Sequence, residues 1–431
     1  MGIKSKKVLL VGAVMAMVLG GGFCVSDRAE AATNGFADGT LSYSNYNKLH
    51  DYLVEVTLSD YNYGDYVKAR KGSAYGIEGC APACSAVCND KYFGRNTDLT
   101  YDDSVQAVIR VPAAKGRFAS ISVGYLRSDI KDFNQKLNAL SYTVLDGINE
   151  NGVAVNCNMY DQPNTETHGG YIKPEGTNPG KPTLSLPAVV RYVLDNAKSA
   201  KQIVKVLKND VNIVCNDTEE FSEFFGLHFM IADKKQHYIV EFVNNKVVVS
   251  DDTVMTNFFN TLHDKAIAEG HKDTDGNGIE TFVKAGEDAN YLQKYPMGVE
   301  RYKILKQHYD EGKISMQKMA ELMQRVKYSQ VYRQDGSEES RKNYFYSEDA
   351  TPVMGEAPER TIQQIYDDKV KHYDVMKAEH DAMWNGRTWK DLRGSEYGIW
   401  QTMNTSVYDL NKLKLLLYVQ EEYDRPYKFS L

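Results

Sequence analysis

The chemistry suggested by this chain concentrates in one segment, Gly79-Cys-Ala-Pro-Ala-Cys-Ser-Ala-Val-Cys-Asn-Asp-Lys-Tyr-Phe-Gly-Arg-Asn-Thr-Asp-Leu99. Asn89-Asp90 stands between two short runs that favour strands, so the sequence predicts a hairpin with a two-residue turn. In that register Cys84 lies opposite Arg95. A neighbouring guanidinium favours the thiolate of a cysteine, and the thiolate is the nucleophile. The hairpin therefore predicts a reactive cysteine beside a fixed cation.

The other cysteines have simpler interpretations. The spacing of Cys80, Cys84 and Cys88 is one residue longer than the C-x₃-C-x₂-C run of cluster-binding enzymes, so we expect no metal or cofactor there. Cys84 and Cys88 share a strand and lie about 13 Å apart at roughly 3.3 Å per residue, too far for a disulfide. A disulfide between Cys80 and Cys88 remains an alternative. Cys157 and Cys215 are expected to be buried apolar fillers.

The rest of the chain alternates between strand and helix patterns. Apolar residues recur at helical spacing in 186–207, which is the clearest predicted helix. Helices are also expected within 298–326 and 358–380. Strands are expected at 84–88, 91–95, 106–111, 118–124, 153–157, 227–232, 237–243, 246–250, 403–409 and 413–420. Antiparallel hairpins mixed with helices favour a layered α+β protein over a doubly wound parallel sheet.

The N-terminus has the order of a secretory signal peptide. Three lysines precede an apolar run from Val8 to about Val25, and Ala29-Glu30-Ala31 offers a small-residue cleavage site. We therefore expect residues 1–31 to be removed and the protein to be secreted. A retained membrane helix is the weaker alternative because the run is short and has no basic stop after it, and lipid attachment at Cys24 is a minor one.

Residues 32–83 are rich in Tyr, Asp, Asn and Gly and contain one amphipathic piece at 49–58. We interpret this segment as an attachment that does not build the core. The whole chain has 431 residues, 51 Lys and Arg against 58 Asp and Glu, and a net charge of −7. This balance gives no general reason to expect a nucleic-acid partner or an anionic membrane surface. No stretch after the signal is long and apolar enough to span a bilayer.

Several motifs then occur in a fixed order. They are Cys84-Ser-Ala-Val with Phe93-Gly-Arg-Asn-Thr-Asp98, Asp146-Gly-Ile-Asn-Glu-Asn-Gly-Val153 followed by Asn158, Leu227-His-Phe-Met-Ile-Ala-Asp233, Ile239-Val-Glu-Phe242, Val254-Met-Thr-Asn257, Pro296-Met-Gly-Val-Glu-Arg-Tyr302 and Thr405-Ser-Val-Tyr-Asp-Leu410. Together they resemble the choloylglycine hydrolase family of linear amide C-N hydrolases, which includes bile salt hydrolases and penicillin V acylases. The resemblance covers residues 84–425.

The resemblance implies an N-terminal nucleophile hydrolase, folded as a four-layer αββα sandwich of antiparallel sheets, whose mature chain begins at its catalytic cysteine. Here that residue is Cys84, so 32–83 would be a propeptide released by self-cleavage and 84–431 the hydrolase domain. Cys80 is a poorer start because Ala-Pro-Ala follows it. A free α-amino group has a pKa of about 7.7 to 8 and can act as a base near neutral pH, whereas an amide nitrogen cannot.

The resemblance also implies roles for single residues, and the set is Cys84, Arg95, Asp98, Asn158, Asn257 and Arg301. Cys84 would supply the nucleophile and the base, and Asp98 would orient its amine. Asn158 and Asn257 match oxyanion donors, and the two arginines would order the site. The substrate would be a small N-acyl amide, and a homo-oligomer such as a tetramer is expected.

Two alternative functions remain at this stage. The same thioester would serve an acyltransferase, and the fold could carry a secreted binding protein without catalysis. The signal and the propeptide argue against a bile-salt substrate. Asp273-Thr-Asp-Gly-Asn-Gly-Ile-Glu280 resembles a calcium loop, but Lys284 stands where a bidentate Glu is needed, so a polar surface loop is the better interpretation.

Overall fold

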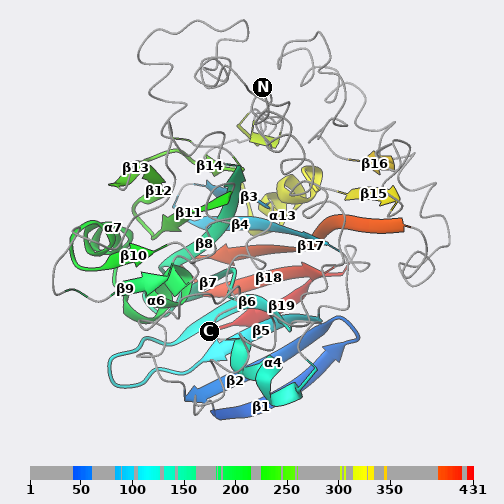
Figure 1. Ribbon diagram of the computed structural model, residues 1–431, viewed down its shortest axis with the longest axis horizontal. Coiled ribbons are helices and arrows are strands. Elements are labelled where there is room, and N and C mark those ends of the chain that lie inside the picture. Colours follow the sequence, from blue (N-terminus) through cyan, green and yellow to red (C-terminus); the bar gives the residue numbers. More distant parts are fainter. Residues whose placement is uncertain are drawn as a thin grey trace, which may run out of the picture.

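A computed structural model describes the two sheets of the molecule and the helices that cover them (Figure 1). The described residues are 42–60, 83–88, 90–100, 105–126, 131–140, 144–161, 181, 183–185, 188–214, 225–243, 246–257, 260, 301–302, 305–306, 314–327, 329–333, 344–346, 397–419 and 425–431. The expectations for the signal peptide, Cys80, Cys215, the loop 273–280 and the helix at 358–380 lie outside these residues. Within them, no helix is long and apolar enough to cross a membrane.

Two sheets form the body of the protein. Sheet A runs β1 (Ser42–His50), β2 (Leu53–Asp60), β5 (Val105–Val111), β6 (Ser120–Leu126), β7 (Asp146–Asn149), β8 (Ala154–Asp161), β11 (Phe225–Ala232), β12 (His237–Val243) and β13 (Lys246–Ser250). Sheet B runs β14 (Val254–Met255), β3 (Ala83–Cys88), β4 (Tyr92–Thr100), β17 (Tyr397–Asp409), β15 (Ser329–Arg333) and β16 (Tyr344–Tyr346), and β18 (Lys414–Val419) joins β17 to β19 (Tyr427–Ser430).

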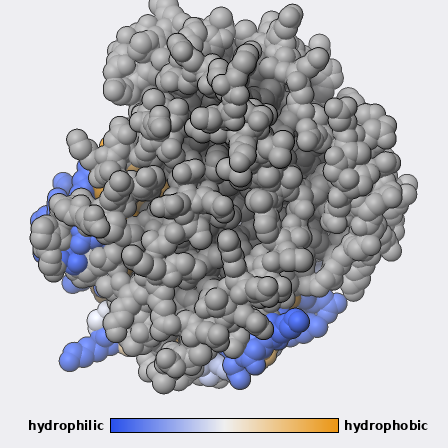
Figure 2. All heavy atoms as spheres, viewed as in Figure 1, coloured by the Kyte–Doolittle hydropathy of each residue, from blue (hydrophilic) through white to orange (hydrophobic). Residues whose placement is uncertain are grey.

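Three hydrophobic cores separate four layers. Phe93, Ile121 and Met230 belong to the core between the two sheets. The outer face of sheet A is covered by α4 (Phe133–Ala139), α6 (Ala188–Asn196) and α7 (Ala200–Asn209), and the outer face of sheet B by α13 (Met316–Arg325). The α+β class and the αββα sandwich are therefore confirmed. In Figure 2 the described residues that reach the visible surface are mainly hydrophilic.

The sequence led us to expect antiparallel sheets, but two of the described strand pairs are parallel. β2 pairs with β5 in parallel, and so does the small pair β9 (Thr183–Ser185) and β10 (Asn212–Val214). The other pairings are antiparallel. A parallel pair needs a crossover, and here the crossover from β2 to β5 contains the whole β3–β4 hairpin of the other sheet.

The hairpin β3–β4 forms where predicted, but its register differs by one residue. Cys88 pairs with Tyr92, so three residues rather than two form the loop, and Asp90 has a positive φ of 48°. Asp90 tolerates this left-handed conformation better than most side chains. As a result Cys84 lies opposite Asn96, and Arg95 lies opposite Ser85. The predicted pairing of Cys84 with Arg95 is wrong.

The segment before the hairpin is also not the peripheral attachment that we expected. β1 and β2 form one edge of sheet A, drawn in dark blue in Figure 1. The side chains of Leu53, Val56 and Leu58 are completely buried. The composition of residues 32–83 concealed these two strands because β1 is polar and largely exposed, and only β2 carries the alternating apolar residues.

The long predicted helix at 186–207 is in fact two helices, α6 and α7, and their buried residues continue one core. Ser199 breaks the run: its backbone is extended and its hydroxyl accepts the amide hydrogen of Gln202, which is a helix N-cap. On sheet B, α13 approaches β4 closely. A Cβ added to Gly94 would lie 2.9 Å from Met319 Cε and Met323 Cγ, so any larger residue there would force these two side chains to move.

Candidate active site

Four neighbouring strands of sheet B bring together most of the predicted site. β14, β3, β4 and β17 are hydrogen-bonded in this order. The backbone of Cys84 lies in β3, Arg95 and Asp98 lie in β4, and Asn257 follows β14 by two residues. Met255 pairs with Ser85, so the chain leaves β14 beside the start of β3. The register of the sheet thus gathers residues that are 173 positions apart in sequence at one end of one hairpin.

Asp98 and Arg301 form a buried ion pair. Arg301 Nη1 lies 2.5 Å from Asp98 Oδ2, and both side chains are completely buried. The hydroxyl of Thr402, opposite Asp98 on β17, donates to Asp98 Oδ1 at 2.5 Å. Arg301 Nε donates to the carbonyl of Val326, the residue that ends α13. The carboxylate is therefore held from β17 and from the 301–326 part of the chain, and each of its oxygens keeps a lone pair for a further donor.

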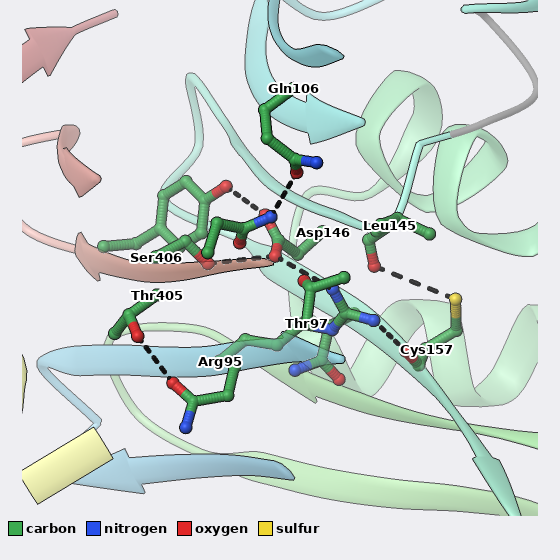
Figure 3. A network of polar contacts seen from close by, with 12 residues as sticks. Arg95, Thr97, Gln106, Leu145, Asp146, Cys157, Thr405 and Ser406 are labelled. Carbon is green, nitrogen blue, oxygen red and sulfur yellow. Dashed lines mark hydrogen bonds and ion pairs between the residues drawn. The ribbon is translucent and has the colours of Figure 1, made fainter. Parts of the chain in front are cut away.

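Arg95 makes its contacts on the opposite face of β4. Its guanidinium donates to the carbonyl of Cys157 at 3.0 Å and to the hydroxyl of Thr97, and it lies 3.5 Å from Asp146 Oδ2 (Figure 3). Because Cys157 and Asp146 belong to sheet A, Arg95 spans the space between the two sheets. The described contacts of Arg95 therefore connect sheet B to sheet A. The side chain of Cys84 is not among the parts of the chain that the structure describes.

Asp146 is the centre of this inter-sheet network. Ser406 Oγ donates to Asp146 Oδ2 at 2.9 Å, and the phenol of Tyr408 donates to Oδ1; both donors come from β17. Burial raises the pKa of the Asp146 carboxyl, while Arg95, Tyr408 and Ser406 counteract part of that rise. Burial and the Asp146 charge raise the pKa of Tyr408 well above its ordinary value, so Tyr408 keeps its proton and remains a donor.

The two predicted oxyanion residues lie on either side of Met255. Asn158 on β8 is completely buried, and its side-chain amide donates to the carbonyl of Met255 at 3.2 Å. Asn257 is 1% exposed. The structure thus links Asn158 of sheet A to the strand that precedes Asn257. Their role as oxyanion donors is still a prediction.

A buried histidine supports the same segment. His228 Nε2 lies 2.8 Å from the carbonyl of Thr256, and Nδ1 lies 3.1 Å from Glu241 Oε1. Because a carbonyl only accepts, Nε2 carries a hydrogen. Glu241 also accepts from the backbone amide of Asn260 at 2.8 Å. His228 and Glu241 therefore fix the backbone on both sides of Asn257.

Sequence reasoning gave no role to His228, Glu241, Thr402 or Asp146. His228, Glu241 and Asp146 stand inside the quoted motifs, and this was the one signal that could have found them. Thr402 carries no such signal, because only the pairing of β17 with β4 places it opposite Asp98. Cys157 is completely buried in the core, as predicted. Among the described residues, no group of three or more His, Cys, Asp or Glu side chains is arranged to hold a metal ion.

The comparisons with known proteins define the class. Residues 87–263, which contain Arg95, Asp98, Asn158 and Asn257, match the sequence model of the linear amide C-N hydrolases. The protein is thus a hydrolase of carbon–nitrogen bonds, other than peptide bonds, in linear amides. Within that class, the model that matches this part of the chain is that of the choloylglycine hydrolase family. The matched range begins three residues after Cys84.

The chain is also similar to solved structures, at low sequence identity. A variant of conjugated bile acid hydrolase from Clostridium perfringens is 15% identical, with 81% of this chain and 92% of that chain covered and a TM-score of 0.42. Penicillin V acylase from Agrobacterium tumefaciens is 15% identical, with 80% and 84% covered and a TM-score of 0.35. No curated protein sequence matches the chain significantly.

Proposed function

We propose that the protein is an exported, self-processed cysteine amidase that cleaves a linear N-acyl amide through a thioester on Cys84. The observation that carries this proposal is the buried ion pair between Asp98 and Arg301. Asp98 lies on β4, which pairs with β3, the strand of Cys84. A fully buried carboxylate that is paired and hydrogen-bonded is costly to build, and it is well suited to orient a cationic group. The family match supplies the reaction class.

Processing would expose the working groups. In the proposed step, the Cys84 sulfur attacks the carbonyl carbon of Ala83, the C–N bond breaks, and the nitrogen takes a proton to become the α-amine. Water then hydrolyses the thioester and leaves a carboxylate on Ala83. The product chain, residues 84–431, carries a thiol and a free amine on one residue.

Turnover would follow the same chemistry on an added substrate. The thiolate attacks the amide carbonyl, the developing oxyanion is stabilised by the side chains of Asn158 and Asn257, and the α-amine passes the thiol proton to the leaving nitrogen. Each oxyanion donor in comparable sites contributes roughly 3 kcal/mol. The amine then activates water, which releases the acyl group as a carboxylic acid. Asp98 would hold the protonated amine in place between the two steps.

The substrate is assigned only as a small N-acyl amide. Conjugated bile acid and penicillin V are the compounds named for the similar structures, so both belong in a first panel beside N-acyl amino acids. Hydrolysis is followed by the appearance of the free amine. An added acceptor amine distinguishes acyl transfer, because transfer consumes the acceptor while hydrolysis does not.

The first experiment determines the N-terminal residue and the intact mass of the purified, exported protein. A chain of 348 residues that starts at Cys84 is the expected result. A protein that starts at Ala32 and stays uncut on long incubation contradicts self-processing and favours a non-catalytic role. A start at Cys80 would move the nucleophile to that residue.

The matched variants are Cys84→Ala and, as a control for the loss of a cysteine elsewhere, Cys215→Ala. We expect Cys84→Ala to abolish both processing and turnover, because it removes the only proposed nucleophile, and Cys215→Ala to retain both. If Cys84→Ala still loses residues 32–83, an external protease makes the cut and the self-cleavage step is wrong.

A further inference from the structure

The cut proposed above would separate strands β1 and β2 covalently from the rest of the fold. Both strands precede Ala83, yet both belong to sheet A. The question is therefore what holds residues 42–60 to the body of the protein once the peptide bond is broken.

β2 takes part in two of the three cores. Leu53 belongs to the core between the sheets, whereas Val54, Val56 and Leu58 belong to the core under the helices. These four side chains are 0 to 2% exposed. Departure of β2 would expose both cores to water. Burial of apolar surface is the main favourable contribution to holding such a strand, so its loss would be costly.

The backbone of β2 is matched to that of β5 along most of its length. Leu53 to Thr57 pair in parallel with Gln106 to Arg110, and the amide of Gln106 donates to the carbonyl of Tyr52 at 2.8 Å. Without β2, the central residues of β5 would form a free edge. Val108 and Ile109 on β5 are completely buried, so that edge would be apolar and prone to pair with another chain.

Side chains of β5 and α4 add polar and aromatic contacts to this segment. Arg110 Nε lies 2.5 Å from Glu55 Oε1, and Arg110 Nη1 donates to the carbonyl of Ser430 at 2.6 Å. The rings of Tyr46 on β1 and Phe133 on α4 form a T-shaped contact, with 5.2 Å between centroids. One arginine therefore links the segment before the cut to the C-terminal strand.

From these contacts we propose that the segment 32–83 is not released after cleavage, but stays bound through residues 42–60 as a second, non-covalent chain of the enzyme. The inference rests on the proposed cut between Ala83 and Cys84. The mature protein is then a two-chain enzyme in which the short chain completes sheet A along β5. It follows that the short chain maintains the fold and does not act only as a transient block of the nucleophile.

The test uses the full-length protein with a specific protease site inserted between residues 61 and 82, so that the cut is made whether or not the chain processes itself. After cutting, the two pieces are run on gel filtration in native buffer and identified by mass. We expect them to co-elute as one species and to separate only in denaturant. A short piece that elutes alone in native buffer overturns the proposal, whether the remaining body stays folded or aggregates.

A matched pair of substitutions tests which contacts hold the short chain. Val56→Asp places a carboxylate in the buried row of β2, and Ser59→Asp places the same group at an exposed position of the same strand. We expect Val56→Asp to weaken retention at least about 100-fold and Ser59→Asp to leave it unchanged. Equal retention of both variants contradicts the role of β2 in binding. If Val56→Asp fails to fold before the cut, Val56→Ala takes its place, with a smaller loss of retention in the same direction.

The two proposals fail in different ways. If the wild-type protein never cuts itself but the engineered pieces co-elute, self-processing is wrong and the strand contacts are strong enough for retention. If the wild-type protein cuts itself at Cys84 and the pieces part in native buffer, the amidase proposal survives and retention is wrong.

Discussion

Two buried guanidinium–carboxylate pairs involve the same strand, β4, and they differ in what surrounds them. Asp98 lies 2.5 Å from Arg301, with one hydroxyl donor from Thr402. Arg95 lies 3.5 Å from Asp146, and most of the Asp146 hydrogen bonding comes from hydroxyl groups of β17. The first pair is a close ionic contact, whereas the second is a wider polar network.

The difference follows from the alternation of a β-strand. Arg95 and Asp98 are three residues apart, so their side chains leave opposite faces of β4. Arg95 enters the space between the sheets and contacts sheet A, while Asp98 lies on the face that α13 covers, where Asn96 also donates to the carbonyl of Met323. One strand thus separates a tie between the sheets from a carboxylate that faces α13 and pairs with Arg301. The comparison teaches that burial of a charge pair alone does not identify a catalytic group.

Arg301→Met breaks the close pair and gives the largest expected effect. Removing one partner leaves the Asp98 carboxylate buried without its cation, which typically costs about 3–5 kcal/mol. We expect the free energy of unfolding to fall by about that amount and processing at Cys84 to stop. Urea unfolding and intact mass are the two measurements.

The double variant Asp98→Asn with Arg301→Met separates stability from chemistry. Without either charge, the desolvation cost disappears, so we expect much of the lost stability to return. Activity should stay absent because nothing holds the α-amine. A double variant that regains activity would mean that Asp98 is only structural, and the comparison above would no longer hold.

Asp146→Asn tests the wider network and should have a smaller effect. Burial raises the pKa of Asp146, so its charged form already carries an energetic cost that the amide does not. We expect a loss of about 1–3 kcal/mol in the free energy of unfolding, from weaker acceptance of the Tyr408 and Ser406 hydroxyls and a less compensated Arg95. Thermal or urea unfolding measures this loss, and kcat should fall far less than in Arg301→Met.

Tyr408→Phe is the control for that network, because it removes one donor to Asp146 without changing any charge. A loss of about 1 kcal/mol is expected, with activity retained. If Asp146→Asn instead abolishes turnover while stability stays the same, the network between the sheets belongs to the chemistry.

A third buried pair, His228 with Glu241, extends the comparison. Besides contacting each other, these two side chains hydrogen-bond to backbone groups on either side of Asn257. His228→Asn removes the donor to the Thr256 carbonyl, whereas His228→Gln can restore a donor near the position of Nε2. We expect His228→Asn to lower kcat by about 10- to 100-fold, since a small misplacement of a positioned group has effects of this size. KM should change little.

The Gln variant should recover part of the lost kcat. Equal loss of kcat in both variants, together with an equal fall in thermal stability, would mean that His228 only fills the core and does not position Asn257. Steady-state kinetics on the substrate found in the panel provides both constants.

The sequence predicted the layers of the fold well because most strands carry their own local signal. The alternating runs at 237–243 and 246–250 became β12 and β13 without change. The hairpin register was predicted wrongly because one extra loop residue, Lys91, is invisible to turn statistics for Asn89-Asp90. A slip of one residue changes every cross-strand pair, and therefore the partner of Cys84.

The site could be predicted only as far as its motifs reach. Asp98 and Arg301 were both candidates, but their contact joins residues 203 positions apart and depends on the packing of α13 against β4. β2 was missed for a related reason. Its alternating apolar residues indicated only an amphipathic piece at 49–58. They do not name a partner strand, because β5, which pairs with β2 in parallel, follows only after the β3–β4 hairpin.

Asp252 offers the smallest effect, and it extends the comparison to a pair at the surface. Burial by itself raises the pKa of the Asp252 carboxyl, but Lys306, Tyr302 and the amide of Val254 outweigh it, so its pKa lies below the ordinary 3.8. An acid with a lowered native pKa adds stability at pH values above about 4, and this stability is lost as the pH falls through the native pKa.

We expect Asp252→Asn to lower the free energy of unfolding by about 1–2 kcal/mol at pH 7. The difference from wild type should shrink as urea unfolding is repeated from pH 7 down to about pH 3, because the wild-type carboxyl then becomes neutral too. Asp251→Asn, at the exposed neighbour, should change the free energy by less than about 0.5 kcal/mol at every pH. A difference for Asp252→Asn that is constant with pH would show that shape, and not charge, fixes this corner. The contrast between charge pairs would then apply only to the buried ones.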